Sequence, residues 1–96
     1  MEASKNPVLA GQRIGVLGGG QLGRMLGLAG IPLGFGFVFL DPSADACASV
    51  TGELLQAGFS DDEAARQLAQ EVDVATFDFE NVPESTARAL EEICPL

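Results

Sequence analysis

The hydrophobic positions of this chain fall into short apolar runs separated by amphipathic segments. The runs at 13–17 and 35–41 are mostly apolar without polar alternation, which is typical of strands buried on both faces of a parallel sheet. Two shorter segments of similar character, 53–58 and 73–77, predict a third and a fourth strand. The segments between and after these strands predict helices.

Two of the helices have recognisable start and stop signals. Residues 21–29 follow a glycine cluster, and Gly30-Ile31-Pro32 predicts the end of that helix. Ser60-Asp61-Asp62-Glu63 has the pattern of a capping box, which predicts a helix start. The helix that follows has one apolar stripe, formed by Ala64, Ala65, Leu68, Ala69 and Val72.

A last helix is predicted from Pro83, because proline suits the first helical position. Ala87, Leu90 and Ile93 are expected to face the core from it. Residues 46–52 predict only a short turn or helix. The order β-α-β-(turn)-β-α-β-α therefore predicts an α/β fold, with a Rossmann-like parallel sheet of about four strands flanked by helices.

The domain organisation expected from this pattern is simple. Residues 1–12 are expected to form an irregular lead-in, and residues 13–96 a single domain. Ligands of such sheets bind beyond the carboxyl ends of the strands. The loops 18–23, 41–45 and 78–82 are therefore expected to gather at one edge of the sheet.

The composition narrows the classes of function. With 14 Asp and Glu against 5 Lys and Arg, the chain has a net charge of −9, which argues against a nucleic-acid partner. There is no His, and Cys47 and Cys94 lack the spacing of metal ligands, so free thiols are expected rather than a zinc site. No apolar run reaches the ~18 residues of a membrane span, and no signal segment is visible. A cytoplasmic protein without a membrane partner is expected.

The sharpest motif is a glycine-rich turn between the first strand and the first helix. Its residues match G-x-G-x-x-G, and Asp41 follows 18 residues after its last glycine. Glycines allow a tight turn and a close approach by a ligand, which then meets the unpaired N–H groups of the helix start. The motif is Gly18, Gly19, Gly20, Gln21, Leu22 and Gly23.

Three interpretations of this turn remain open from the residues alone. The turn could bind a nicotinamide or flavin dinucleotide, with Asp41 on the ribose. It could bind another ligand at the same place. It could also serve only the close packing of the helix on the strand, because several unrelated α/β families turn this corner with glycines.

A second cluster, Asp78-Phe79-Glu80-Asn81-Val82-Pro83, follows the fourth predicted strand. Acids at alternate positions of an extended segment point to the same side, so Asp78 and Glu80 could both bind the hydroxyls or the amine of a ligand. They could equally be solvated turn residues that cap the last helix. Judged alone, the pair favours this second interpretation.

The two motifs together resemble the start of 5-(carboxyamino)imidazole ribonucleotide synthetase. They occur in the family's order and at its spacing, and the likeness extends over about residues 13–93. The family usually has Glu where Asp78 stands, so the acid here is one methylene shorter. The matching segments are 14–26, 29–34, 39–42 and 77–83.

The resemblance implies the first, pre-ATP-grasp domain of a three-domain ATP-grasp ligase. Such ligases use ATP and bicarbonate to carboxylate 5-aminoimidazole ribonucleotide in de novo purine biosynthesis. ATP and magnesium bind between the second and third domains, so no cofactor is expected in this chain. The implied partners are the ribonucleotide, bicarbonate and the ATP-grasp domains of the same enzyme. A homodimer is a further option.

The resemblance also assigns roles to single residues. In the related formate-dependent glycinamide ribonucleotide transformylase, residues matching Gln21 and Leu22 and an acid matching Asp78 bind the ribonucleotide. Substrate binding by Gly20, Gln21, Leu22, Asp78 and Glu80 is therefore implied, with Gly18, Gly19 and Gly23 as the glycines of a phosphate-binding loop. No catalytic residue and no metal ligand is expected here, so the chain alone should not be catalytic. The alternative is a freestanding module that binds an NAD-type dinucleotide or a mononucleotide.

Overall fold

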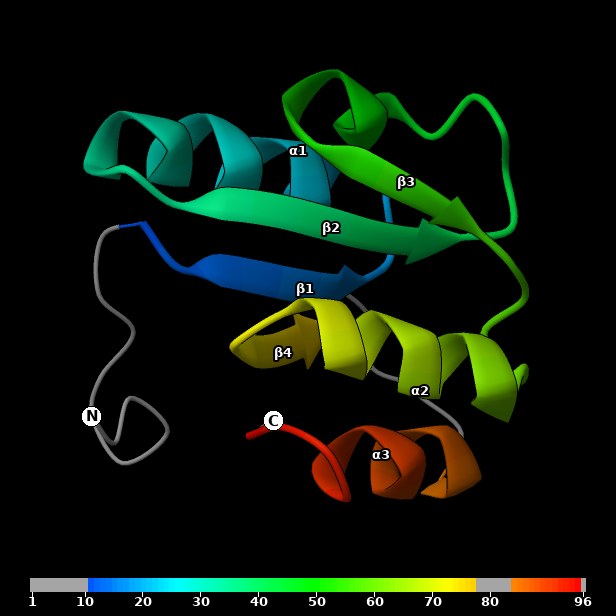
Figure 1. The fold of residues 1–96 in the computed structure, drawn as a ribbon. Helices are drawn as coiled ribbons and strands as arrows, with labels where there is room; N and C mark the ends of the chain where they lie inside the picture. Colours follow the sequence, from blue (N-terminus) through cyan, green and yellow to red (C-terminus); the bar gives the residue numbers. More distant parts are fainter. Residues whose placement is uncertain (1–10, 78–83, 96) are drawn as a thin grey trace.

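The computed structural model describes residues 11–77 and 84–95, and within them one parallel sheet forms the centre of the fold. Its strands lie in the order β3-β2-β1-β4, and every neighbouring pair is parallel (Figure 1). The predicted α/β class and the predicted order of elements are therefore confirmed. The strands are β1 (Arg13–Leu17), β2 (Gly36–Asp41), β3 (Glu53–Gln56) and β4 (Val74–Phe77).

Helices cover both faces of this sheet (Figure 1). Helix α1 and the short 3-10 helix η3 lie on one face, and helices α2 and α3 lie together on the other. The turn or helix expected at 46–52 is η3, and a further 3-10 helix, η2, continues directly from α1. The bounds are α1 (Gln21–Gly30), η2 (Ile31–Leu33), η3 (Cys47–Thr51), α2 (Asp62–Glu71) and α3 (Glu84–Glu91).

The two central strands supply the core on both sides, which explains their continuous apolar sequence. Val16 pairs with Phe39 and faces α1, whereas Leu17 pairs with Leu40 and faces α2 and α3. All four side chains are fully buried. Burial on both faces removes the polar alternation that marks a half-exposed strand.

Helix α1 approaches the sheet through glycine. Gly23, Gly27 and Gly30 form its buried face. A Cβ atom on Gly27 would lie 2.2 Å from Oγ1 of Thr51, and one on Gly30 would lie 2.4 Å from Cζ of Phe37. Neither position can hold a larger residue without displacing its neighbour. The large side chains of α1 consequently lie on its outer side: Leu22, Met25, Leu26 and Leu28 are all exposed.

Helix α2 begins one residue later than the capping-box prediction required. Its N-cap is Asp61, whose carboxylate accepts a hydrogen bond of 3.0 Å from the backbone N–H of Ala64. The prediction with Ser60 as the cap is therefore wrong, because Asp61 is an equally good cap and its carboxylate reaches the third helical N–H. The apolar stripe of α2 is confirmed: Ala64, Ala65, Leu68 and Ala69 are buried, and Val72 packs against the same cluster.

The buried face of α3 differs from the prediction. Leu90 is buried as expected, but Ala87 is only half-buried and Ile93 is exposed. The hydroxyl of Thr86 donates 2.7 Å to the carbonyl oxygen of Phe59, and this polar contact turns α3 so that Thr86, Ala89 and Leu90 point inward. The predicted helix start at Pro83 lies outside the described residues.

Both cysteines are free thiols in the structure. Cys47 is half-buried and Cys94 is buried in the cluster between the sheet and α3. Desolvation raises the pKa of the Cys94 thiol, so that thiol stays protonated at neutral pH. Across residues 11–77 and 84–95, no helix is long and apolar enough to cross a membrane.

Replacing Gly27 by Ala is expected to destabilise the fold, although alanine favours helices. The added Cβ meets Thr51 at 2.2 Å, and overpacking of this kind costs about 1–3 kcal/mol against a helix-propensity gain of up to about 1 kcal/mol. Each kcal/mol corresponds to roughly 4–8 °C in the melting temperature of a domain of this size. Thermal unfolding followed by circular dichroism measures the shift.

Gly58→Ala is the matched control for this change. Gly58 has a negative φ, and no atom lies within 4 Å of the position that a Cβ would occupy. The melting temperature of Gly58→Ala should stay the same or rise slightly. A Gly27→Ala variant as stable as the parent protein would contradict the close approach of α1.

Candidate functional site

The loops that follow β1 and β2 meet at the carboxyl edge of the sheet. The backbone N–H of Gly18 donates 2.8 Å to the carbonyl oxygen of Leu40. Gly18 has a φ of 113°, a conformation that favours glycine. Two of the three loops expected at this edge, 18–23 and 41–45, therefore lie together, whereas 78–82 falls within the undescribed residues 78–83.

Gly19 is enclosed between the end of β2 and η3. Its N–H donates 2.8 Å to Oδ2 of Asp41, and its carbonyl oxygen accepts 2.8 Å from the N–H of Ala48. A Cβ atom on Gly19 would lie 2.8 Å from Cβ of Ala46 and 3.2 Å from Cβ of Asp41. The glycine is thus required by the fixed neighbours on both sides of the loop.

Asp41 stabilises this loop with both of its carboxylate oxygens. Oδ2 accepts from Gly19, and Oδ1 accepts 2.9 Å from the N–H of Ser43 in an Asx turn. The spacing of Asp41 from the glycines is also that of an acid that binds a ribose in dinucleotide-binding domains. The structure instead directs the carboxylate at the protein's own backbone. The sequence Asp41-Pro42-Ser43 is a turn signal that points to this role.

The start of α1 presents backbone donors at the same edge. Gly20 is the N-cap, with no side-chain hydrogen bond to the helix and no acidic residue in the first turn. The first bond of the helix runs from the N–H of Arg24 to the carbonyl oxygen of Gly20. Gln21 and Leu22 are exposed, whereas Gly23 is buried on the inner side of the helix. Gly20, Gln21 and Leu22 therefore form the accessible part of the motif.

Strand β4 ends beside this loop. Phe77 is in register with Leu17, the last residue of β1, and its side chain is exposed. Asp78 and Glu80 follow Phe77 directly in the sequence but lie outside the described residues. Of the predicted site, the structure therefore describes the glycine loop, whereas the acids Asp78 and Glu80 lie outside the described residues.

Most of the described arginines pair with acids away from this loop. Arg13 binds Glu53 at 2.9 Å, at the end of the sheet where β1 begins. Arg66 and Arg88 lie on α2 and α3 and pair with Glu92 and Glu84. Among residues 11–77 and 84–95, no cluster of three or more His, Cys, Asp or Glu could hold a metal ion. Among these residues, the edge offers hydrogen bonds from backbone N–H groups and from Gln21.

One protein-family model matches the whole described region of the chain. The family model of the ribonucleotide synthetase preATP-grasp domain matches residues 11–96. The N5-carboxyaminoimidazole ribonucleotide synthase of Pseudomonas aeruginosa is 57% identical over 84 residues, which are 88% of this chain and 23% of that protein. The chain therefore spans about a quarter of the length of this relative.

Solved structures of similar proteins have the same fold. The N5-carboxyaminoimidazole synthetase of Staphylococcus aureus, complexed with ADP, superposes with a TM-score of 0.89 at 37% identity, covering 94% of this chain and 24% of that one. The N5-carboxyaminoimidazole synthase of Aspergillus clavatus, in complex with ADP and 5-aminoimidazole ribonucleotide, gives 0.77 at 33% identity, covering 88% and 23%. The chain thus belongs to the N5-carboxyaminoimidazole ribonucleotide synthase family, in the part formed by its pre-ATP-grasp domain.

Proposed function

We propose that this chain is the ribonucleotide-holding domain of a ligase that uses ATP and bicarbonate to carboxylate 5-aminoimidazole ribonucleotide in de novo purine biosynthesis. The match of residues 11–96 to the pre-ATP-grasp family is the observation that carries the proposal. The relative from Aspergillus clavatus, whose structure holds ADP and that ribonucleotide, supports the choice of substrate. The open start of α1 at the carboxyl edge offers a place for it.

We assign residues 13–96 to a single pre-ATP-grasp domain and place ATP, magnesium and the bicarbonate chemistry in the ATP-grasp domains. The relatives are about four times as long as the matched region, which leaves room for those domains. Within the described residues there is no cluster of carboxylates for magnesium. We propose that the role of this domain is to bind and orient the substrate.

The proposed contacts start from the glycine loop. Gly20 leaves space for a ligand beside the helix start, where Gln21 can donate from its side-chain amide and Leu22 can contact the substrate. Backbone N–H groups at a helix start, here those of Gln21 and Leu22, favour an anionic or hydroxyl group of the ribonucleotide. Gly18 and Gly19 shape the turn, and Gly23 seats the helix below it.

The acids Asp78 and Glu80 are assigned to the opposite side of the same ligand. The register of Phe77 with Leu17 supports this assignment, because the chain leaves β4 beside the point where it leaves β1. Carboxylates there would accept hydrogen bonds from hydroxyl or amine groups of the ribonucleotide. The shorter Asp78 reaches less far than the family's usual Glu.

The chain by itself is expected to hydrolyse no ATP above background. The lysines and metal-binding acids that an ATP-grasp ligase needs for the nucleotide belong to the other domains. A phosphate-release assay of the pure 96-residue protein with magnesium, bicarbonate and aminoimidazole ribonucleotide measures this. Turnover that persists through repeated purification would contradict the assignment of ATP to other domains.

NAD and NADP are expected not to bind with micromolar affinity. Both carboxylate oxygens of Asp41 accept backbone N–H groups, so the acid that a dinucleotide-binding domain places on the ribose is engaged elsewhere. Isothermal titration calorimetry with each dinucleotide measures the affinity. Micromolar binding would favour the freestanding dinucleotide module instead.

The structural role of Asp41 can be tested separately by substitution. Asp41→Asn should lower stability by about 1–3 kcal/mol, since either the partly buried N–H of Gly19 or the exposed N–H of Ser43 then meets an amide NH2 instead of an oxygen. Asp45→Asn removes the same charge from an exposed position of the same turn and should change stability little. Equal melting temperatures for the two variants would contradict the structural role of Asp41.

The substrate loop is tested in a chimera that joins this chain to the remaining part of the Pseudomonas aeruginosa relative. Gln21→Ala and Asp78→Ala should each raise KM for the ribonucleotide more than KM for ATP. Each lost hydrogen bond should cost about 1–3 kcal/mol, or roughly ten- to a hundredfold in kcat/KM for that substrate. Steady-state kinetics with each substrate varied separately measures both constants.

Three further variants sharpen the interpretation. Asp78→Glu restores the usual acid of the family and should be mild or favourable. Gly20→Val should be worse than either alanine change, because a branched side chain blocks close approach to the loop. Gln67→Ala, on the exposed side of α2, is the matched control for Gln21→Ala. If the alanine variants change only KM for ATP, or change neither constant, the proposal that this domain binds the ribonucleotide is contradicted.

A further inference from the structure

Thr51, the last residue of η3, is a buried polar side chain that is linked to the glycine loop. Its hydroxyl donates a hydrogen bond of 2.7 Å to the carbonyl oxygen of Ala48. The backbone N–H of Ala48 in turn donates 2.8 Å to the carbonyl oxygen of Gly19. Only one residue therefore separates the hydroxyl of Thr51 from the loop that precedes α1.

The same side chain lies against the backbone of α1. A Cβ atom on Gly27 would lie 2.2 Å from Oγ1, 2.6 Å from Cβ and 3.3 Å from Cγ2 of Thr51, so every side-chain heavy atom of the threonine faces the helix at this point. Gly27 lies less than about two turns after Gln21, at 3.6 residues per turn. Because the helix is joined by its own hydrogen bonds, a displacement at Gly27 also displaces Gln21.

The sheet holds Thr51 from its other side. Gly52 follows it directly, and a Cβ atom there would lie 2.5 Å from the carbonyl oxygen of Phe37 in β2. The end of η3 is thus seated on the backbone of β2. Thr51 therefore cannot follow α1 if the helix shifts, and the helix has to adapt to Thr51.

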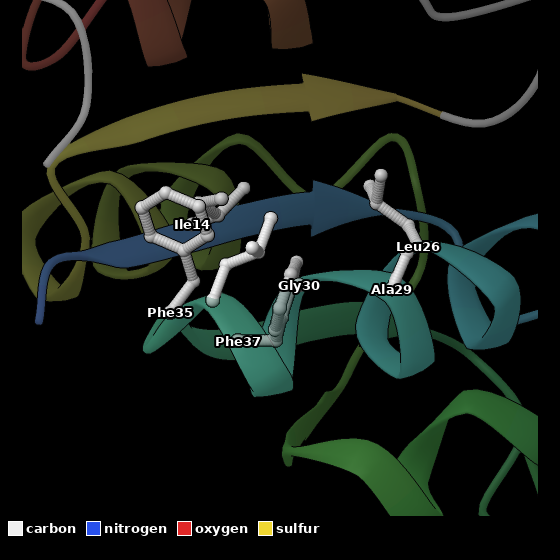
Figure 2. A pocket seen from close by; sticks show the side chains of 7 residues that line it. Ile14, Leu26, Ala29, Gly30, Phe35 and Phe37 are labelled. Carbon is white, nitrogen blue, oxygen red and sulfur yellow. The ribbon is translucent and has the colours of Figure 1, made fainter. Parts of the chain in front are cut away.

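The packing around the last turns of α1 leaves space. An apolar pocket of about 190 Å³ lies there, beside the amino ends of β1 and β2 (Figure 2). Leu26 and Ala29 of the helix line it together with Phe35 and Phe37. Side-chain packing is incomplete on this side of the helix, so the position of α1 depends more on its close contact at Gly27.

We propose that Thr51 is a positioning residue for the ribonucleotide. Its side chain sets the place of α1 relative to Gly19, and with it the place of the Gln21 amide and of the N–H groups at the helix start. Thr51 does not itself contact the substrate and acts through Ala48 and Gly27. Groups that bind by hydrogen bonds have to be held within about 0.5 Å of the productive geometry. This inference rests on the function proposed for the glycine loop.

The test uses Thr51→Val in the chimera with the Pseudomonas aeruginosa relative. A methyl group in place of the hydroxyl is wider and cannot donate, so the carbonyl of Ala48 loses its partner and α1 is pushed away from η3. KM for the ribonucleotide should rise at least about fivefold, while KM for ATP stays within about twofold of the parent value. Thr51→Ser keeps the hydroxyl and should leave both constants near those of the parent chimera. Steady-state kinetics with each substrate varied separately measures them.

Thr86→Val is the matched control, because it removes a similar hydrogen bond far from the loop. The hydroxyl of Thr86 is buried and also donates 2.7 Å to a backbone carbonyl oxygen, that of Phe59. Thr86 belongs to α3, which lies on the opposite face of the sheet from α1 (Figure 1). Thr86→Val should lower the melting temperature as Thr51→Val does, yet leave KM for the ribonucleotide unchanged.

Circular dichroism shows whether each variant is folded. Thr51→Ala, which removes the hydroxyl without adding width, replaces Thr51→Val if that variant does not fold, and the same rise in KM is expected. An unchanged KM for the ribonucleotide would overturn the proposal. So would an equal rise in Thr86→Val or in Thr51→Ser, because the effect would then not depend on this hydroxyl.

Gln21→Ala, measured in the same chimera, separates this inference from the proposed function. A rise in KM for the ribonucleotide in Gln21→Ala but not in Thr51→Val would overturn the role of Thr51 and leave the substrate assignment intact. No rise in either variant would overturn both. A rise in Thr51→Val alone would support the positioning role and show that the substrate contacts other groups of the loop than the Gln21 amide.

Discussion

The close approach of α1 to the sheet is the constraint on which the proposed site depends. Gly27 lies against Thr51, and the hydroxyl of Thr51 is itself fixed by a 2.7 Å hydrogen bond to the carbonyl oxygen of Ala48. Helix and η3 are therefore held together without any large side chain between them. This contact directs the open start of α1 to the carboxyl edge of the sheet, and it leaves the leucines of the helix on the outer side.

The same segment η3 also supports the glycine loop. The N–H of Ala48 binds the carbonyl oxygen of Gly19, and Asp41 binds its N–H, so both backbone groups of one glycine are fixed. A loop held in this way keeps its shape before any ligand arrives, which lowers the conformational entropy that binding must overcome. In the proposed site, this preorganisation comes from Asp41 and Ala48 and not from the residues assigned to the ligand.

Much of the fold could be predicted because buried parallel strands leave a clear signal. The runs 13–17 and 35–41 are apolar on both faces, and glycine and proline mark the turns after them. The errors arose where a polar contact overrides the apolar pattern. Thr86 turns α3 through its bond to Phe59, which exposes Ile93, and Asp61 rather than Ser60 caps α2.

The glycine loop could also be predicted from its spacing, whereas its support could not. Gly18 and Gly20 predict a tight turn. Ala46 and Ala48 enclose that turn, but nothing in the sequence around these alanines predicts the contact. The spacing between the glycines and Asp41 fits a dinucleotide-binding domain equally well. Within the structure, the direction of the carboxylate argues against the dinucleotide interpretation, and that direction depends on the N–H groups of Gly19 and Ser43.

The charge of the chain limits what this domain can contribute to the proposed ligase. It has 14 acidic and 5 basic residues, and Arg13, Arg66 and Arg88 are paired with acids of the same chain. Backbone N–H groups at a helix start can orient a polar or anionic group, but they do not neutralise a phosphate as cationic side chains do. In the proposed complex, positive charge for the phosphate would come from Arg24, which is exposed on α1, or from another domain. The domain would then select the substrate by shape and hydrogen bonding, and the reaction would begin only once the ATP-grasp domains hold it from the other side.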